Sequence, residues 1–448
     1  MTSKKHLLLL AIGFPPAAKS SAYRLREMAN QFAALGWDVT ALTIADESWE
    51  REYGLDHSLL DAVDPRVRIV KVPIARVDLE TDIRTFSRER AIEPKSWIAK
   101  QAERDQQVFP EPVFGGWLPA LQTAALKIHS ERPADLVLAS CAPYVLLGVA
   151  KRLWDEHKVP YSIDLRDGWS LDVISGRPAF APDSRQGLIE ADVLSNSLLT
   201  WCVNDAIADF YRDRHPAFAD RIRVARNGFD VDSVPASLRE PDPGNGLDFG
   251  YLGSVNFRSS FLATILGAWH DAREKDDLIA RSRFEIRGHI GAGWRREANA
   301  HVDVINRASQ DGVTFGGSVA NSDVAATYAR WDALVLMLVG GKYVTSGKVY
   351  EFAASGLPIV SAHETEHDAS EVLRDRPMWS GPVGNEREAL TEAFINVGRM
   401  TMAATPEQRA QAREQAQRFE RSAPIARMAR ELVDCVNAGS ANNPGKPA

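Results

Sequence analysis

The stretch TSGKVYEFAASGLPIV, residues 345–360, predicts a helix that is followed by a strand. Thr345 or Ser346 supplies a side-chain oxygen that can cap the helix, and Gly356 can end it in the left-handed conformation before Pro358 begins the strand. The first turn of such a helix presents unpaired N–H groups and the positive end of the helix dipole. This end of the segment therefore favours an anion.

The same alternation of strand and helix extends outward through the chain. Short apolar runs separated by helical segments lie at residues 7–14, 39–44, 67–72, 136–140, 161–165, 199–203 and 222–225, and then at 249–252, 284–287, 313–315, 333–338 and 358–362. This pattern predicts parallel sheets covered by helices on both faces, and 448 residues exceed the usual size of one core. The predicted fold class is α/β, with two doubly wound, Rossmann-like domains that face a cleft. Ligands are expected at the carboxyl ends of the strands.

A segment rich in proline, glycine and polar residues, 233–246, is the best linker in the chain. It separates an N-terminal domain, residues 1–232, from a C-terminal domain, residues 247–405. Residues 76–117 interrupt the strand–helix pattern and indicate an insertion over one edge of the cleft. We expect the helical residues 406–438 to cross back to the N-terminal domain and residues 439–448 to be disordered.

Composition limits the possible partners. The formal net charge of -7 gives no reason to expect a nucleic-acid partner or a general attraction to anionic lipid, so we expect at most peripheral membrane contact. The three cysteines are widely spaced and suggest neither a disulfide framework nor a zinc site. The apolar run at residues 7–12 is short and is cut by Pro15 and Pro16, unlike a signal peptide. We therefore predict a cytoplasmic protein that binds small molecules and holds no metal.

Two charged residues in the predicted helix point to a ligand. Lys348 lies in the first turn, where a cation opposes the helix dipole at a cost of roughly 0.3–1 kcal/mol, and a bound diphosphate would offset this cost. Glu351 lies one turn further along the same face, where a carboxylate can accept the two hydroxyls of a ribose. A solvent-exposed Lys/Glu pair on an amphipathic helix would explain the same spacing equally well.

The segments KVYEF at 348–352 and ASGLPIV at 354–360 resemble the nucleotide-sugar motif of retaining glycosyltransferases of the GT-B fold, family-4 type. The resemblance implies that Glu351 binds the donor ribose and Lys348 the diphosphate, with Ser346 and Gly347 also at the donor. Many members carry a second Glu eight positions earlier, where Tyr343 stands here. A subgroup with Asp-Leu-Arg-Asp and Lys-x-x-Glu motifs lacks that carboxylate too, so the departure obscures the choice of sugar.

Two segments of the N-terminal half resemble this family in the expected order. The segment GFPP at 13–16 resembles its N-terminal glycine turn, which implies a ligand at Gly13, and Lys19 could reach the donor phosphate or the acceptor. The segment DLRDGW at 164–169 resembles the Asp-Leu-Arg-Asp motif at a strand end. We expect Arg166 to pair with Asp164 or Asp167, and Asp167 to contact the acceptor, although a salt bridge that only shapes the loop is as good an interpretation.

Two glycine turns of the C-terminal half complete the resemblance. The segment FGYLGS at 249–254, followed by Arg258, resembles the turn where Gly253 and Ser254 let a phosphate approach and an arginine clamps it. Gly288, in the segment that begins RGHI at 287, is expected near the nucleotide base. Many relatives also carry a His near residues 140–143, where this sequence has none, and Ser140 is a candidate substrate contact in its place.

These observations predict the transfer of a sugar from a UDP-, GDP- or dTDP-sugar to an acceptor hydroxyl, with retention of configuration and without a metal or cofactor. Arg258, Lys348 and the helix N-terminus would stabilise the leaving diphosphate, and Asp167 would act at the acceptor. The acceptor could be a carbohydrate, a lipid-linked molecule or a natural product. Two alternatives stay open: a sugar-nucleotide epimerase of the same fold, and a catalytically silent sugar-nucleotide-binding protein.

Overall fold

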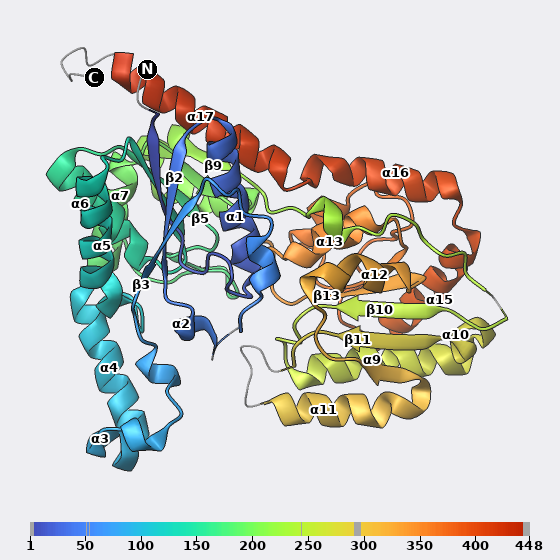
Figure 1. Cartoon of the computed structure of the whole chain (residues 1–448). Helices are drawn as coiled ribbons and strands as arrows, with labels where there is room; N and C mark the ends of the chain where they lie inside the picture. Colours follow the sequence, from blue (N-terminus) through green and yellow to red (C-terminus); the bar gives the residue numbers. More distant parts are fainter. Residues whose placement is uncertain (1–3, 51, 53, 243, 291–296, 442–448) are drawn as a thin grey trace. The chain divides into compact units, whose positions relative to one another are not determined.

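The computed structural model describes residues 4–50, 52, 54–242, 244–290 and 297–441. The described residues fall into two compact units. Unit 1 contains those of Met1–Asp172, Arg177–Arg226 and Ser422–Ala448, and unit 2 contains those of Val173–Gly176 and Asn227–Arg421. Each unit is built on a parallel sheet (Figure 1), which confirms the predicted α/β fold class.

The sheet of unit 1 has the order β3-β2-β1-β4-β5-β8-β9 among the described residues, and every neighbouring pair is parallel. Its central strands β1, β4 and β5 are buried along their whole length, as expected for a parallel sheet with helices on both faces. The strands are β1 (His6–Leu10), β2 (Asp38–Ile44), β3 (Arg68–Val72), β4 (Leu136–Cys141), β5 (Tyr161–Leu165), β8 (Thr200–Cys202) and β9 (Ile222–Val224). A small antiparallel pair, β6 (Leu171–Asp172) and β7 (Arg177–Pro178), follows β5.

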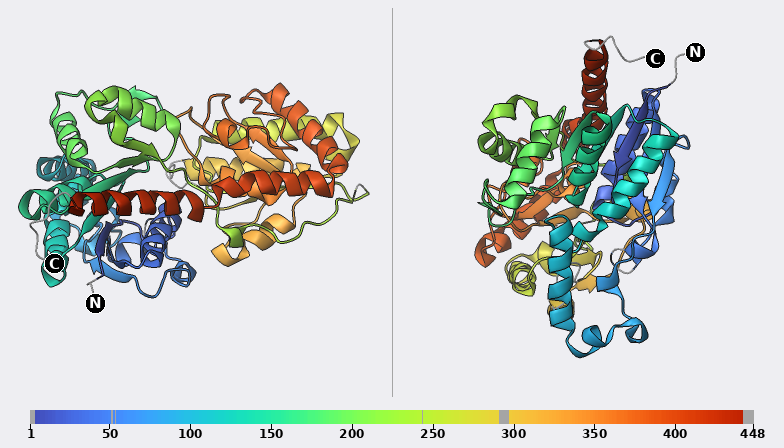
Figure 2. Two further views of the ribbon diagram at one scale, coloured as in Figure 1. Left: turned by 90° about the horizontal axis from the view of Figure 1, so that it is seen from above. Right: turned by 90° about the vertical axis from the view of Figure 1, so that its left-hand side faces the viewer.

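Helix α17 (Ser422–Ala441) packs beside α1 (Ser20–Ala34), although the two are far apart in the sequence (Figures 1 and 2). Apolar side chains of both helices, among them Phe32 and Met428, belong to one buried cluster over the sheet. The C-terminal helix is thus part of unit 1, and it continues to Ala441, within the predicted tail at 439–448. The remaining residues of that tail, 442–448, lie outside the described residues. The other main helices of unit 1 are α2 (Glu47–Glu50), α5 (Leu118–Glu131), α6 (Val145–His157), α7 (Arg185–Asn196) and α8 (Asp205–Arg214).

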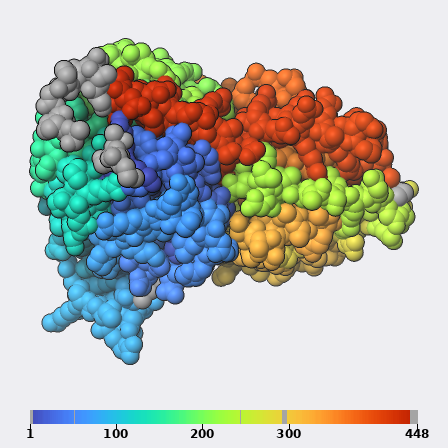
Figure 3. Space-filling view, turned by 45° about the horizontal axis from the view of Figure 1, so that its top comes forward, coloured from blue at the N-terminus to red at the C-terminus, as the bar shows by residue number. Residues whose placement is uncertain are grey.

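The expected insertion at residues 76–117 contains α3 (Arg88–Ile92) and α4 (Pro94–Val108), which project from unit 1 (light blue in Figure 3). The C-terminal part of the insertion contacts unit 1 through Glu111. The Glu111 carboxylate accepts hydrogen bonds from the N–H groups of Tyr144 (3.0 Å) and Val145 (2.7 Å) at the start of α6. Burial raises the pKa of Glu111 to about 7. Trp169 stacks between Phe109 of the insertion and Tyr144 at this attachment, so this tryptophan is a packing residue.

The sheet of unit 2 has the order β12-β11-β10-β13-β14 in the described residues, again with parallel neighbours. Phe249, Trp269 and Phe394 pack edge to face in the core between the sheet and helices α9 (Ser259–Lys275) and α15 (Arg387–Ala403). The strands are β10 (Asp248–Leu252), β11 (Arg283–Arg287), β12 (Val313–Phe315), β13 (Ala333–Met337) and β14 (Ile359–Ala362). The helices are α9 (Ser259–Lys275), α10 (Asp277–Arg281), α11 (Ala298–Arg307), α12 (Val324–Ala329), α13 (Gly347–Ser355), α14 (Ala369–Leu373), α15 (Arg387–Ala403) and α16 (Pro406–Ala416).

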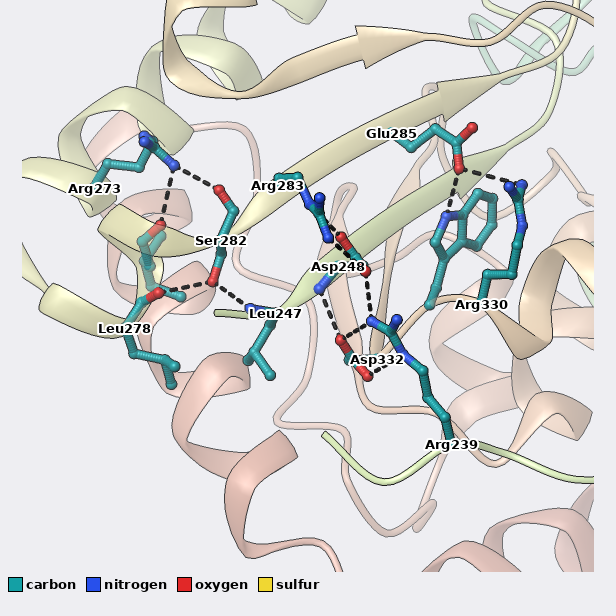
Figure 4. Close-up of polar contacts among 12 residues, drawn as sticks. Arg239, Leu247, Asp248, Arg273, Leu278, Ser282, Arg283, Glu285, Arg330 and Asp332 are labelled. Atoms are coloured by element: carbon teal, nitrogen blue, oxygen red, sulfur yellow. Dashed lines mark hydrogen bonds and ion pairs between the residues drawn. The ribbon is translucent and has the colours of Figure 1, made fainter. Parts of the chain in front are cut away.

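A network of charged residues lies at the amino-terminal edge of the unit 2 sheet (Figure 4). The buried carboxylate of Asp332, just before β13, accepts hydrogen bonds from Arg239 Nε (2.9 Å) and from the N–H of Asp248 (2.8 Å). Asp248 in turn pairs with Arg239 (2.6 Å) and with Arg283 (2.9 Å). Arg239 belongs to the segment 233–246 that the sequence predicts as a linker. Arg239 therefore lies within unit 2, whose longer segment runs from Asn227 to Arg421.

Candidate functional site

The helix of the opening motif, α13, begins and ends as predicted. Ser346 is its N-cap, and the Ser346 hydroxyl accepts a hydrogen bond from the N–H of Lys348 (3.3 Å). Gly356 ends the helix with a φ of 80°, in the left-handed region. Apart from its chain neighbours and the backbone of its own helix, no atom of the described residues lies within 4 Å of the position that a Cβ on Gly347 would occupy. The backbone at the positive end of the helix dipole is therefore open to a ligand.

Lys348 and Glu351 contact each other one turn into α13. Lys348 Nζ lies 2.8 Å from Glu351 Oε2, with side-chain exposed fractions of 34% and 16%. The hydroxyl of Tyr328, on α12, donates to the same carboxylate oxygen at 2.7 Å. The pair thus exists, but its carboxylate is mostly buried and is oriented by a third residue, unlike that of a surface pair. Sequence reasoning missed Tyr328, since it lies 23 residues before Glu351 on a separate helix.

The two glycine turns of unit 2 lie at the carboxyl ends of adjacent strands and contact each other. Gly288, with a φ of 130°, packs so tightly that a Cβ on it would overlap the carbonyl oxygen of Gly253. The N–H of Gly253 donates to the Arg287 carbonyl (3.0 Å), which fixes the first turn, and Ser254 is exposed beyond it. The structure therefore brings Gly253 and Gly288 together, although they were predicted as separate contacts.

Arg258 is exposed and occupies the N-cap position of α9, directly after the first glycine turn. The N-terminus of α9 is itself already bound by a carboxylate, since Glu297 accepts a hydrogen bond from the Ser259 N–H (2.6 Å). Strands β11, β10, β13 and β14 are neighbours in a parallel sheet, so the segments that follow them share its carboxyl edge. Arg258 and α13 therefore lie at the same edge.

In unit 1, the predicted glycine turn faces the start of α1. Gly13 has a φ of 88°, and a Cβ on it would lie 3.1 Å from Ser21 Oγ and 3.3 Å from Lys19 Cδ. Lys19 lies at the N-cap of α1, with its ammonium 4.9 Å from the centre of the Trp49 ring. Burial, followed by the charge of Arg166, lowers the pKa of Lys19 to about 8. Gly13 and Lys19 are thus brought together at the carboxyl end of β1.

The predicted pairing within the DLRD segment is wrong for Asp164. This carboxylate is fully buried in β5 and pairs with Arg24 of α1 (2.6 Å), and Ser140 Oγ donates to it at 2.6 Å. Asp164 lies inside the strand and faces the helix, whereas Arg166 lies beyond the strand end and donates to the Ala142 carbonyl instead. The hydroxyl of Ser140, predicted to contact substrate, is therefore held within the fold.

The second expected partner of Arg166 does not pair with it either. Asp167 is exposed at the end of β5, and no ion pair joins it to Arg166 in the part of the chain that the structure describes. Its charge acts on Lys19, whose pKa it raises in opposition to burial. The same described part holds no cluster of three or more His, Cys, Asp or Glu arranged for a metal ion. None of its helices is both long enough and apolar enough to cross a membrane.

Comparison with known proteins adds a domain match to this geometry. Residues 21–228 match the family model of the glycosyl transferase 4-like domain. This match supports a glycosyltransferase-type function. None of the curated proteins matches the sequence.

Three solved structures show the fold. A sucrose-phosphate synthase from Thermosynechococcus elongatus is 15% identical, with a TM-score of 0.65 over 98% of this chain and 100% of that chain. A glycosyltransferase from Rickettsia africae is 11% identical, with a TM-score of 0.63 over 97% and 99%. A trehalose-6-phosphate structure from E. coli, bound with UDP-2-fluoro glucose, is 12% identical, with a TM-score of 0.64 over 96% and 99%. The fold is that of the GT-B glycosyltransferases.

Proposed function

We propose that this chain is a retaining glycosyltransferase that transfers a sugar from a nucleotide sugar to an acceptor hydroxyl. The observation that carries the proposal is the N-terminus of α13, where an open glycine, a lysine and a mostly buried, oriented carboxylate lie within the first turns of the helix. The domain match at residues 21–228 supports the same class of reaction. In this proposal unit 2 holds the donor and unit 1 the acceptor.

Each group at α13 has a defined role in holding the donor. The N–H groups at Gly347 and the ammonium of Lys348 bind the diphosphate, because both carry positive charge at an open end of the helix. Glu351 accepts hydrogen bonds from the ribose hydroxyls, and Tyr328 keeps its carboxylate in place. When the diphosphate binds, the Lys348 ammonium moves its charge from Glu351 towards the phosphate. Gly288 lies near the nucleotide base.

The chemical step breaks the bond between the sugar C1 and the diphosphate oxygen and forms a bond from C1 to the acceptor oxygen on the same face. The acceptor proton passes to a phosphate oxygen, so that the leaving group itself acts as the base. Arg258, Lys348 and the α13 N-terminus stabilise the negative charge that develops on the diphosphate, the largest electrostatic contribution in such a site. We assign to these groups the role that a metal ion would otherwise have. Asp167 contacts the acceptor.

The three cysteines are free, with Cys141 and Cys202 buried. We place the protein in the reducing cytoplasm, where thiols persist. The proposed acceptor is a carbohydrate, a lipid-linked sugar or a natural product.

A thermal-shift screen with UDP, GDP, dTDP and ADP tests the donor site. We expect one nucleotide to raise the melting temperature of the wild type, because a ligand that binds only the folded state stabilises it. The shift should disappear in Glu351→Ala and persist in Glu392→Ala, which removes a surface carboxylate paired with Lys275. A sugar conjugate of the stabilising nucleotide then identifies the product, and an NMR coupling constant shows its anomeric configuration. Inversion, or equal shifts in both variants, would contradict the proposal.

A further inference from the structure

The insertion that contains α3 and α4 has almost no core of its own. Residues 76–104 are all described, and each of them is at least partly exposed. In α4, whose 15 residues are likewise described in full, only Asp105 is buried. Figures 1 and 3 show α3 and α4 projecting from the rest of unit 1 as an arm. Because helices in proteins owe most of their stability to the packing of an apolar face, a surface that covers this arm would stabilise it.

The tip of this arm, residues 82–100, exposes three isoleucines. Ile83 is 76% exposed, Ile92 62% and Ile98 55%. These three make up half of the large aliphatic side chains whose surface is more than half exposed in the described part of the chain. Single exposed apolar side chains are ordinary in folded proteins, but several within one short segment mark an interaction surface.

The tip is basic, although the chain as a whole carries a formal net charge of -7. Its basic residues are Arg84, Arg88, Arg90, Lys95 and Lys100, and its acidic residues are Asp82, Glu89 and Glu93. The net charge of the whole chain therefore conceals a local excess of positive charge at the place where the isoleucines are exposed. Such a combination suits an anionic surface with an apolar interior.

Part of this charge stays available for a partner. Arg84 pairs with Asp82 (2.7 Å), and the pair lies at the surface. Arg88 and Lys95 are exposed, and they join no ion pair in the part of the chain that the structure describes. Since exposed ion pairs contribute little and are easily exchanged, the basic side chains of the tip can turn to an external anion.

The tip is held together by Arg90 and two aromatic rings. The Arg90 guanidinium lies 3.8 Å from the centre of the Phe86 ring and 4.6 Å from that of the Trp97 ring. Arg90 also donates to the carbonyls of Val77 (2.5 Å) and Glu80 (2.8 Å). These contacts order the tip while the three isoleucines stay mostly exposed, so the isoleucines are not needed to fold it.

We propose that the tip docks unit 1 on an anionic lipid surface. The three isoleucines enter the boundary between headgroups and acyl chains, and the basic side chains lie against the lipid phosphates. A projecting arm with aliphatic and basic residues interspersed suits lipids, because lipids adapt to its shape, whereas a protein partner must present a matching groove. A second copy of this chain is disfavoured, since a symmetric contact would bring two basic tips together. This inference goes beyond the proposed function and does not depend on it.

Flotation of the full chain with vesicles tests the docking. The two kinds of vesicle are phosphatidylcholine alone and an equal mixture of phosphatidylcholine and phosphatidylglycerol. We expect wild type to bind the anionic vesicles about tenfold more tightly or better, because each basic residue near an anionic surface adds to binding. High salt should remove this preference, since it screens the charges.

A triple variant, Ile83→Ser with Ile92→Ser and Ile98→Ser, removes the apolar part of the tip. Its binding to anionic vesicles should fall about tenfold or more, because three aliphatic side chains no longer leave water. Its melting temperature should match wild type, since these side chains are exposed in the folded protein. The matched control is Val231→Ser in unit 2, which changes an aliphatic side chain that is 59% exposed outside the tip and should bind vesicles as wild type does.

A double variant, Arg88→Gln with Lys95→Gln, removes charge from the tip and leaves the isoleucines in place. It should bind anionic vesicles about tenfold more weakly than wild type and neutral vesicles equally well. Equal binding of wild type to the two kinds of vesicle would overturn the inference. Binding to anionic vesicles that neither variant weakens would also overturn it.

Two further outcomes would contradict the docking. One is the absence of vesicle binding by wild type. The other is a wild-type dimer in sedimentation velocity that the triple variant converts to a monomer, because the tip would then belong to a second copy. The nucleotide thermal shift should be the same in wild type and in all of these variants. Loss of that shift in every protein would defeat the proposed function and leave the vesicle result standing.

Discussion

The two edges of the unit 2 sheet use charged residues in opposite ways. At the amino edge, the carboxylates of Asp332 and Asp248 are paired with Arg239 and Arg283 within the protein (Figure 4). At the carboxyl edge, the backbone at Gly347 is open, Arg258 is exposed, and no acidic residue lies in the first turn of α13. Paired charges hold the amino edge of the sheet together, and we propose that the open helix end at the carboxyl edge binds a ligand.

This comparison predicts that changes at the carboxyl edge affect activity, while changes at the amino edge affect stability. The largest effect is expected for Lys348→Ala. Removing one cation from the developing diphosphate should lower kcat about 100- to 1000-fold. The melting temperature should change little, because the lysine side chain is one-third exposed and Tyr328 still binds Glu351. Steady-state kinetics and a melting curve measure both quantities.

The control for this variant is Lys275→Ala, which removes an exposed lysine whose carboxylate partner lies 3.4 Å away. Turnover in the control should match wild type. Normal turnover in Lys348→Ala would show that the charge at α13 does not act on the leaving group.

Asp332→Ala should have the opposite profile. The carboxylate is buried and binds both Arg239 and the first N–H of β10, so its loss leaves those donors unsatisfied. We expect the free energy of unfolding to fall by about 3 kcal/mol in urea titrations, with kcat of the folded enzyme unchanged. Asp271→Ala, which breaks an exposed pair with Arg387, should cost less than about 1 kcal/mol. If both variants lost the same stability, burial at the amino edge would not matter.

The sequence predicted the fold and the helix α13 because both depend on local signals. Apolar runs of strand length and the Ser346 and Gly356 caps require no knowledge of distant contacts, and the structure has them where predicted. The contacts that sequence reasoning missed join residues far apart in the chain. Tyr328 reaches Glu351 from another helix, and Arg24 lies 140 residues before the Asp164 carboxylate that it binds.

The error at Asp164 has a definite physical origin. Three charges within four residues at a strand end suggested that neighbours pair with one another, but only Asp164 lies inside the strand β5, which ends at Leu165. Asp164 therefore meets α1, while Arg166 has already left the strand. The roles of Arg258, Asp167 and the glycine turns depend on a ligand and stay predictions.

Glu111 is a buried carboxylate whose hydrogen bonds come from backbone N–H groups and not from a cation. Backbone N–H groups bind it, and burial still raises its pKa to about 7, above its ordinary value of about 4.3. The folded state thus holds the proton more tightly than the unfolded state does. The resulting stability is present in full below pH 4 and is lost as the pH rises through 7.

Glu111→Gln removes this titration from the protein. We expect the wild type to lose about 2–3 kcal/mol relative to the variant between pH 4.5 and pH 8, measured by urea unfolding at each pH. The difference between the two proteins cancels the titration of all other groups. If the stability difference between wild type and Glu111→Gln did not change with pH, the two N–H groups would keep the Glu111 carboxylate ionised. A buried carboxylate would then not need a cation such as those that bind Asp332 and Asp248 in unit 2.

Tyr328→Phe gives the smallest and most specific test of the comparison, since it changes no charge at the carboxyl edge. The variant removes only the hydroxyl that donates to Glu351 Oε2, so the carboxylate keeps Lys348 but loses its fixed orientation toward the ribose. The affinity for the stabilising nucleotide should fall about fivefold, equivalent to about 1 kcal/mol, in a calorimetric titration. Tyr161→Phe in unit 1 removes a hydroxyl that donates to the Val193 carbonyl, and it should leave nucleotide affinity unchanged. If Tyr328→Phe bound nucleotide as tightly as wild type, Lys348 alone would position Glu351. The Lys348 ammonium could not then move from Glu351 to the diphosphate without disordering the proposed ribose site.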